Sequence, residues 1–179
     1  MSDHFLDETG VKTEADAMRE TLKSALQQRQ NTVYARAERG NERTEFRSEF
    51  AKLIRSESRR YVLPILVSDD HHCEAVRRIS DTLSSRFGNI LKDGRLRYGT
   101  AQKALNLYLK FLWRLGTVTT PPHCPVDGTV LKAASINGSW TRSDSEKEYA
   151  GWINSLKAKA AGRSLAEWEY SIWRPTTNA

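Results

Sequence analysis

One helix-length segment of this chain is apolar on nearly every side, and it constrains the fold more than any other feature. It spans residues 101–115 between Gly99 and Gly116, with Thr100 placed to cap it. Its large or apolar side chains are Ala104, Leu105, Leu107, Tyr108, Leu109, Phe111, Leu112 and Trp113. A helix without a polar side has to be surrounded by other elements. The segment therefore predicts a central, buried helix.

Shorter helical patterns lie on both sides of this segment. Apolar residues three or four positions apart, with capping residues before them, predict helices at 13–30, from Glu42 onward, at 69–87, at 127–134, after Ser143 and after Ser164. The capping boxes are Thr13-x-x-Asp16, Ser143-x-x-Glu146 and Ser164-x-x-Glu167. The fold class predicted is all-α, a compact bundle of about seven helices with little or no sheet.

The remaining segments define the domain organisation. Residues 1–12 are expected to be a flexible N-terminal arm, and residues 13–179 a single helical domain. Gly40 and Asn41 are expected to break the chain before the helix that begins at Glu42. The β-branched run 61–67 could be a short strand, but it has no partner strand, so a buried extended linker is predicted.

Several protein classes are excluded by composition. Two cysteines, Cys73 and Cys124, are too few for a disulfide framework. The acidic stretch 1–7 lacks the apolar region of a signal peptide, and no window approaches the ~20 apolar residues of a membrane span. We expect a cytoplasmic protein with reduced thiols and no membrane partner.

Positive charge is concentrated in one part of the sequence. The chain carries a formal charge of +6, and the segment 86–114 alone contains seven cations and a single acid, Asp93. The cations are Arg86, Lys92, Arg95, Arg97, Lys103, Lys110 and Arg114. Clustered cations attract polyanions, among which nucleic acid is the commonest. A solvated basic face without a specific ligand explains the composition equally well.

Lys103 and Asp127 form the first candidate site. Lys103 is expected in the first turn of the apolar helix, where the helix dipole and partial burial favour a neutral, nucleophilic amine. Asp127 follows a proline-rich loop and begins the next helix, where backbone N–H groups keep a carboxylate ionised. An amine facing a fixed carboxylate can form a Schiff base at a sugar C1′. The alternative is a surface lysine and a helix-capping aspartate that are unrelated in space.

The order of these elements resembles the helix–hairpin–helix DNA glycosylases, especially the 8-oxoguanine DNA glycosylases. The glycine-bounded segment 88–99 matches the hairpin, Gly99-Thr100-Ala101 its exit, Lys103 the catalytic lysine, and Pro125-Val126-Asp127 the loop with the catalytic aspartate. The resemblance covers about residues 76–134. It implies a helix–hairpin–helix element and a glycosylase with AP-lyase activity on duplex DNA that contains an oxidised or modified base.

The resemblance also implies roles for neighbouring residues. Phosphates would be held by Lys92, Arg95, Arg97, Gly99 and Thr100. A flipped base would be held by Gln102, Tyr108, Trp113, His123 and Trp173, although aromatic residues of this kind more often belong to the core. No cofactor is implied, and the oligomeric state stays open. The rival hypothesis is a non-catalytic helical module that binds nucleic acid or protein.

Histidines and cysteines occur together at two places, His71-His72-Cys73 and His123-Cys124. Imidazoles and thiolates are zinc ligands, so one residue from each group could in principle share a metal. Neighbouring residues on one helix cannot all face one ion, and the spacing fits no usual zinc pattern. We therefore predict no metal site.

Overall fold

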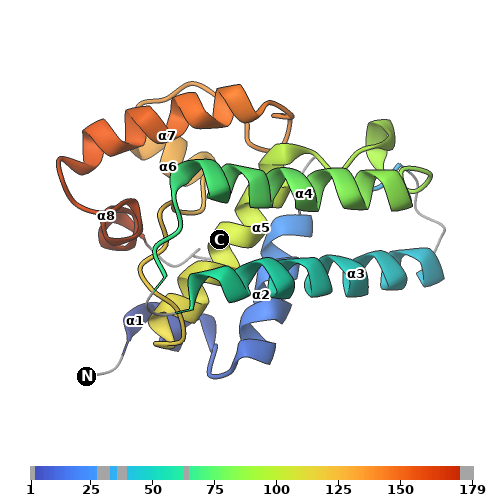
Figure 1. Ribbon diagram of the computed structural model, residues 1–179, viewed down its shortest axis with the longest axis horizontal. Helices are drawn as coiled ribbons and strands as arrows, with labels where there is room; N and C mark the ends of the chain where they lie inside the picture. Colours follow the sequence, from blue (N-terminus) through green and yellow to red (C-terminus); the bar gives the residue numbers. More distant parts are fainter. Residues whose placement is uncertain (1–2, 28–32, 36–39, 63–64, 174–179) are drawn as a thin grey trace.

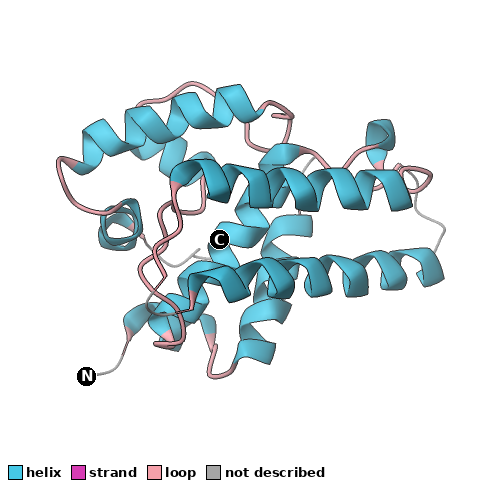
Figure 2. Cartoon of the chain, in the orientation of Figure 1, coloured by secondary structure: helices cyan, strands magenta, loops and turns pink. Residues whose placement is uncertain are grey.

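The computed structural model describes residues 3–27, 33–35, 40–62 and 65–173. These residues form helices and loops without any β-strand (Figure 2), and their one β-type pairing is an isolated bridge between Tyr34 and Leu91. The helices are α1 (His4–Thr9), α2 (Glu14–Leu26), α3 (Gly40–Ser58), η1 (Arg59–Tyr61), α4 (Asp69–Phe87), η2 (Lys92–Gly94), α5 (Tyr98–Arg114), α6 (Gly128–Ala133), α7 (Glu146–Ala160) and α8 (Leu165–Ile172). The predicted all-α bundle is confirmed.

The helix α5 passes through the centre of the bundle, as its composition predicts. Helices α3 and α4 lie side by side in Figure 1, and α5 contacts both of them as well as α2. Helix α7 lies along another edge of the molecule and packs against α8. Every residue of α5 from Tyr98 to Leu112 is buried. The burial of this helix makes it the frame on which the other elements are placed.

The start of α5 differs from the prediction. The helix begins at Tyr98 with Arg97 at the N-cap, so Thr100 lies inside the first turn and does not cap it. The first backbone donors bond to the distant loop before α7 instead: Tyr98 N–H donates to Asp144 Oδ1 (3.0 Å) and Gly99 N–H to the Ser143 carbonyl (3.0 Å). A tertiary contact thus replaces a local cap, which a local sequence pattern does not reveal.

The N-terminal segment is not a flexible arm from residue 3 onward. Asp3 caps α1 by accepting from the amides of Phe5 and Leu6, and the Phe5 ring is buried. This ring stacks on Phe111 of α5 with centroids 4.8 Å apart, and Asp3 also pairs with Arg114. The expectation of an arm over residues 1–12 is therefore wrong for its described part, while residues 1–2 lie outside the description.

Three boundary predictions also need correction. The run 61–67 is not buried as a whole: Tyr61 is buried, but Val62 is 49% exposed and Leu66 83% exposed, and residues 63–64 lie outside the described residues. Gly40 starts α3 rather than breaking the chain before it. The N-cap of α7 is Ser145, which accepts from the amide of Glu148, and not Ser143.

Two capping predictions are confirmed. Thr13 with Asp16 and Ser164 with Glu167 form capping boxes at the starts of α2 and α8. Helix α2 ends at Leu26, and residues 28–30, to which the sequence extends it, lie outside the described residues.

A glycine-bounded turn joins α4 to α5, as the sequence predicts. Gly88 ends α4, and a Cβ atom there would lie 2.9 Å from the Ser84 carbonyl and 3.0 Å from the Gly94 carbonyl. The turn is held to α4 by Ser80, whose hydroxyl donates to the Leu96 carbonyl (2.6 Å). Gly88 is therefore required by close backbone packing, and the turn is a firm connection between two buried helices.

Candidate functional site

Lys103 and Asp127 meet in space. The Nζ atom of Lys103 lies 2.5 Å from Oδ2 of Asp127, and the lysine side chain is almost completely buried. Lys103 is the sixth residue of α5, so it lies in the second turn rather than the first. The two residues are brought together by the loop after α5, which folds back along the helix and ends at the N-cap of α6.

Asp127 is held at both carboxylate oxygens. Its Oδ1 atom accepts from the amides of Thr129 (3.0 Å) and Val130 (3.1 Å), and Oδ2 faces Lys103. Burial alone would raise the pKa of Asp127, but the attraction of the Lys103 ammonium and these hydrogen bonds outweigh it and hold the pKa below its ordinary value. Asp127 is therefore an ionised carboxylate with one oxygen directed at the amine.

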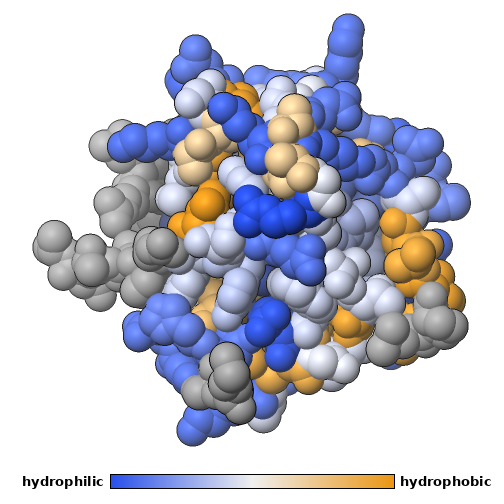
Figure 3. All heavy atoms as spheres, turned by 90° about the vertical axis from the view of Figure 1, so that its left-hand side faces the viewer, coloured by the Kyte–Doolittle hydropathy of each residue, from blue (hydrophilic) through white to orange (hydrophobic). Residues whose placement is uncertain are grey.

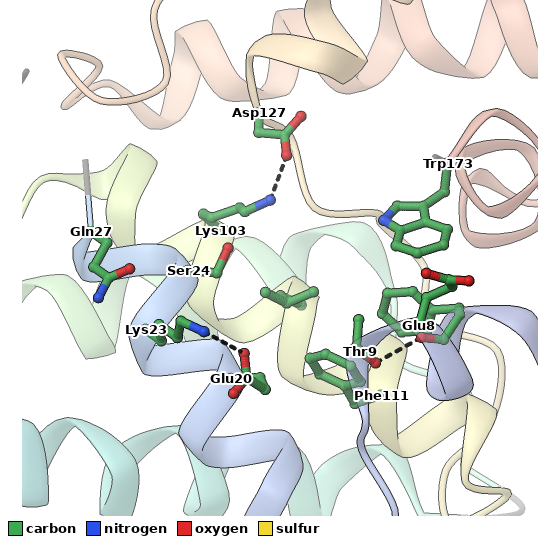
Figure 4. A pocket seen from close by; sticks show the side chains of 12 residues that line it. Glu8, Thr9, Glu20, Lys23, Ser24, Gln27, Lys103, Phe111, Asp127 and Trp173 are labelled. Atoms are coloured by element: carbon green, nitrogen blue, oxygen red, sulfur yellow. Dashed lines mark hydrogen bonds and ion pairs between the residues drawn. The ribbon is translucent and has the colours of Figure 1, made fainter. Parts of the chain in front are cut away.

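A cavity of about 630 Å³ opens beside this pair. In Figure 4, Lys103 and Asp127 close one side, Trp173 stands on a second side, and α2 forms the side opposite Trp173. The lining residues outside α5 are mainly Phe5, Glu8 and Thr9 from α1 and Glu20, Lys23, Ser24 and Gln27 from α2. The cavity thus has a polar wall and an aromatic wall, with an amine and a carboxylate between them.

Most of these lining residues are missed by the sequence analysis. The residues of α1 fall in the expected arm, and those of α2 are polar side chains outside its buried apolar face. Trp173 is the one predicted base-pocket residue that lines the cavity. Its ring stands edge-on to Phe5, with centroids 5.0 Å apart.

The other predicted base-pocket residues lie elsewhere. Tyr108, Gln102 and His123 are buried and do not line the cavity. Trp113 is partly buried and packs edge-on against Tyr170. Because side chains project from every side of α5, proximity in sequence to Lys103 does not place a residue in the same cavity.

Among the predicted phosphate contacts, the two at the start of α5 are not available. Gly99 and Thr100 are buried, and the Gly99 amide already donates to Ser143. Lys92 is exposed on η2. Arg95 and Arg97 lie on the same turn but form ion pairs, Arg95 with Asp144 (2.8 Å) and Arg97 with Asp93 (2.6 Å).

Ion pairing is general in the basic segment. Six of its seven cations have carboxylate partners: besides Arg95, Arg97 and Lys103, the pairs are Arg86 with Glu45 and Glu49, Lys110 with Glu169, and Arg114 with Asp3. On the face drawn in Figure 3, hydrophilic residues dominate and hydrophobic ones form small separate groups. The charge cluster in the sequence is therefore largely neutralised by acids from other elements.

One of these pairs is buried deeply. Lys110 Nζ lies 2.8 Å from Glu169 Oε2, and it also lies 4.0 Å from the centroid of the Phe5 ring. Burial lowers the pKa of Lys110 and raises the pKa of Glu169, while their mutual attraction opposes both shifts. Lys110 therefore packs against the Phe5 ring of the aromatic wall without lining the cavity itself.

The two histidine and cysteine groups do not form a metal site in the described part of the chain. No cluster of three or more His, Cys, Asp or Glu side chains is arranged there to hold an ion. The ring centroids of His72 and His123 lie 4.4 Å apart. The Nδ1 atom of each histidine shares a hydrogen bond with a tyrosine hydroxyl, that of Tyr61 for His72 and that of Tyr149 for His123. Cys73 and Cys124 are free thiols.

Comparison of the chain with protein-family models, with curated proteins and with solved structures found no match. Among the described residues, no helix has the length and apolar character needed to cross a bilayer.

Proposed function

We propose that this chain is a cytoplasmic DNA-binding enzyme, a DNA glycosylase with AP-lyase activity that excises an oxidised or modified base such as 8-oxoguanine. The contact between Lys103 and Asp127 at the side of a cavity carries the proposal. It is the pairing of amine and carboxylate that the resemblance to the helix–hairpin–helix glycosylases requires. The two residues lie far apart in sequence, and a purely local capping role for Asp127 does not need the lysine.

The reaction follows from the chemistry of the pair. Oδ2 of Asp127 is placed to take a proton from Lys103, which leaves a nucleophilic amine. The amine attacks C1′, a C1′–Nζ bond forms, and the C1′–N bond to the base breaks. The base leaves with the electron pair of that bond and takes the proton that Asp127 accepted from Lys103. Asp127 is thereby a carboxylate again, and it stabilises the positive charge that develops on the sugar. Opening of the sugar ring then gives a Schiff base, from which strand cleavage proceeds.

The cavity supplies a place for the excised base. Enzymes that act on a base inside a duplex extrude it into a pocket with aromatic faces and hydrogen-bonding groups. Trp173 and Phe111 offer the aromatic faces, and Ser24 and Gln27 on α2 offer polar groups. Its volume of about 630 Å³ lies in the usual range for small-molecule sites.

A second candidate function is a non-catalytic helical module that binds nucleic acid or protein. The observation that favours it is the ion pairing of six cations in the basic segment, which reduces the field available to attract DNA. In this case the bond between Lys103 and Asp127 serves only to attach α6 to α5.

Borohydride trapping distinguishes these functions. The protein is incubated with duplexes that carry 8-oxoguanine, other modified bases or an abasic site, and covalent adducts and released bases are measured. We expect an adduct with the wild type and with Lys147→Ala, an exposed lysine on α7, and none with Lys103→Ala. Absence of both adduct and base release in the wild type would refute the enzyme, and trapping by Lys103→Ala would refute the assignment of the lysine.

DNA binding is measured separately by the dependence of affinity on salt. A protein that neutralises phosphates loses affinity steeply as the salt concentration rises, because counterions are released on binding. Affinity that is insensitive to salt would count against a DNA partner in either function.

A further inference from the structure

Two adjacent residues of α5 hold two adjacent residues of the loop that ends at α6. Lys103 bonds to the carboxylate of Asp127, and Gln102 bonds to the backbone of Val126 at both polar groups. Gln102 Nε2 donates to the Val126 carbonyl (2.6 Å), and Gln102 Oε1 accepts from the Val126 amide (3.2 Å). Gln102 is completely buried. It therefore fixes the peptide immediately before Asp127.

The peptide of Val126 sets the direction of every bond that follows. Because Val126 presents its own N–H on one side and its C=O on the other, only one orientation of the Gln102 side-chain amide satisfies both bonds. Since Oε1 can only accept, the Asn106 atom that faces it has to be the donor Nδ2, at 3.1 Å. The same nitrogen donates to the hydroxyl oxygen of Tyr149 (3.0 Å). The hydroxyl proton of Tyr149 is left to point at Nδ1 of His123, 2.9 Å away.

The series of bonds ends at the surface. With Nδ1 of His123 accepting, its Nε2 carries the proton and donates to Asp69 Oδ1 at 3.2 Å. Burial lowers the pKa of His123, although Asp69 opposes this, so the ring is neutral as the bond directions require. Asp69, the first residue of α4, also pairs with Lys157 of α7. Three helices and the loop thus share one hydrogen-bond network with no conflict of donors.

We propose that Gln102 is the positioning residue for Asp127, and that Asn106, Tyr149, His123 and Asp69 hold its amide in one orientation. The inference rests on the proposed function, because it assumes that Asp127 takes part in the reaction. The amides of α6 hold Oδ1 of Asp127, and the Gln102 bonds hold the backbone just before this residue, so both attachments together set where Oδ2 points. A misplacement of about 1 Å at a reacting group can lower a rate about 10²-fold.

The main test uses Gln102→Leu. This change keeps a side chain of similar size but removes the amide and with it both bonds to Val126. We expect its single-turnover rate of base release to fall about 10²-fold, while its affinity for the same duplex stays unchanged. Ser58→Ala is the matched control, since among the described residues this buried hydroxyl bonds within α3, to the Arg55 carbonyl. A Gln102→Leu rate equal to the wild-type rate would overturn the proposal.

A second measurement does not depend on activity. The carboxyl of Asp127 is titrated by ¹³C NMR and assigned by comparison with Asp127→Asn. If Gln102→Leu lets the carboxylate move away from Lys103, the pKa of Asp127 rises toward its ordinary value. An unchanged titration overturns the positioning role. A wild type that releases no base refutes the proposed function, while a raised pKa in Gln102→Leu still supports the positioning of Asp127.

Tyr149→Phe is the milder second variant, and it tests the part of the proposal that concerns the network holding the Gln102 amide, even if Gln102→Leu does not fold. It removes one hydroxyl from the network and leaves both bonds between Gln102 and Val126 in place. We expect a smaller fall in rate and a smaller rise in the pKa of Asp127 than in Gln102→Leu. A wild-type rate together with a wild-type titration would exclude the network beyond Gln102 from the positioning role.

Discussion

Replacing Gly99 by alanine tests the packing at the start of α5. A Cβ atom at this position would lie 1.8 Å from the Trp140 carbonyl oxygen and 3.1 Å from the Ser143 carbonyl oxygen. Both neighbours are backbone atoms, so no rotation of a side chain can relieve the overlap. The loop over residues 140–143 has to retreat by more than 1 Å to reach an ordinary contact distance of about 3.4 Å.

The expected cost has two parts. Overpacking at a buried site costs about 1–3 kcal/mol. The retreat of the loop also weakens the bond from the Gly99 amide to the Ser143 carbonyl, now 3.0 Å long, which contributes about 1 kcal/mol. We expect Gly99→Ala to lower the free energy of unfolding by about 2–4 kcal/mol, and the melting temperature by roughly 5–15 °C for a chain of this size.

Urea denaturation monitored by circular dichroism measures this change. Gly151→Ala is the matched control, because Gly151 is exposed inside α7 and a Cβ atom there meets nothing within 4 Å. Alanine is preferred to glycine in a helix interior, so the control is expected to gain up to about 1 kcal/mol. A Gly99→Ala protein within about 0.5 kcal/mol of the wild type, the scale of a neutral surface substitution, would refute the packing argument.

Two further predictions concern the buried charges. The pKa of Asp127 is held below its ordinary value of 3.8, so its ionised form contributes stability above about pH 4 that is lost as the pH falls through the folded-state pKa. Asp127→Asn is therefore expected to make the melting temperature depend less on acid pH. An unchanged dependence would contradict this expectation. Glu169→Gln leaves the Lys110 ammonium buried without its counter-charge and is expected to cost roughly 3–5 kcal/mol in urea denaturation. The double variant Glu169→Leu with Lys110→Met is expected to recover most of that loss, and a single variant as stable as the wild type would show that the pair is not buried in solution.

The contact between Lys103 and Asp127 was a hypothesis that needed the family resemblance, because local signals place each residue on its own element but do not give the distance between the two. Lys103 lies near the start of the most apolar helix, and Asp127 follows a proline-rich loop and precedes a helix. The loop from the end of α5 to Asp127 can span roughly 40 Å when extended, so its length permits the contact with Lys103 but does not impose it. The central position of α5, by contrast, was predictable from its composition alone, since a helix that is apolar on nearly every side has to be buried.

The cavity and the state of the cations could not be predicted in this way. Helix α1 has only six residues, too few for a periodic pattern, and it is held by the stacking of Phe5 on Phe111. The cations of the basic segment find partners from other parts of the chain, such as Asp144 for Arg95 and Asp3 for Arg114. Counting charges within residues 86–114 leaves these distant acids out, so the count gives a larger positive field than the folded protein has.

The aromatic wall of the cavity joins opposite ends of the described chain. Phe5 of α1 and Trp173 after α8 make an edge-to-face contact, whereas Lys103 and Asp127 belong to α5 and to the N-cap of the next helix, α6. Contacts between distant parts of a chain carry the larger loop-closure cost and form later in folding. We therefore expect the amine and the carboxylate to be assembled before the wall closes. A nascent or partly unfolded chain would then expose Lys103 and Asp127 to solvent before the cavity beside them is complete.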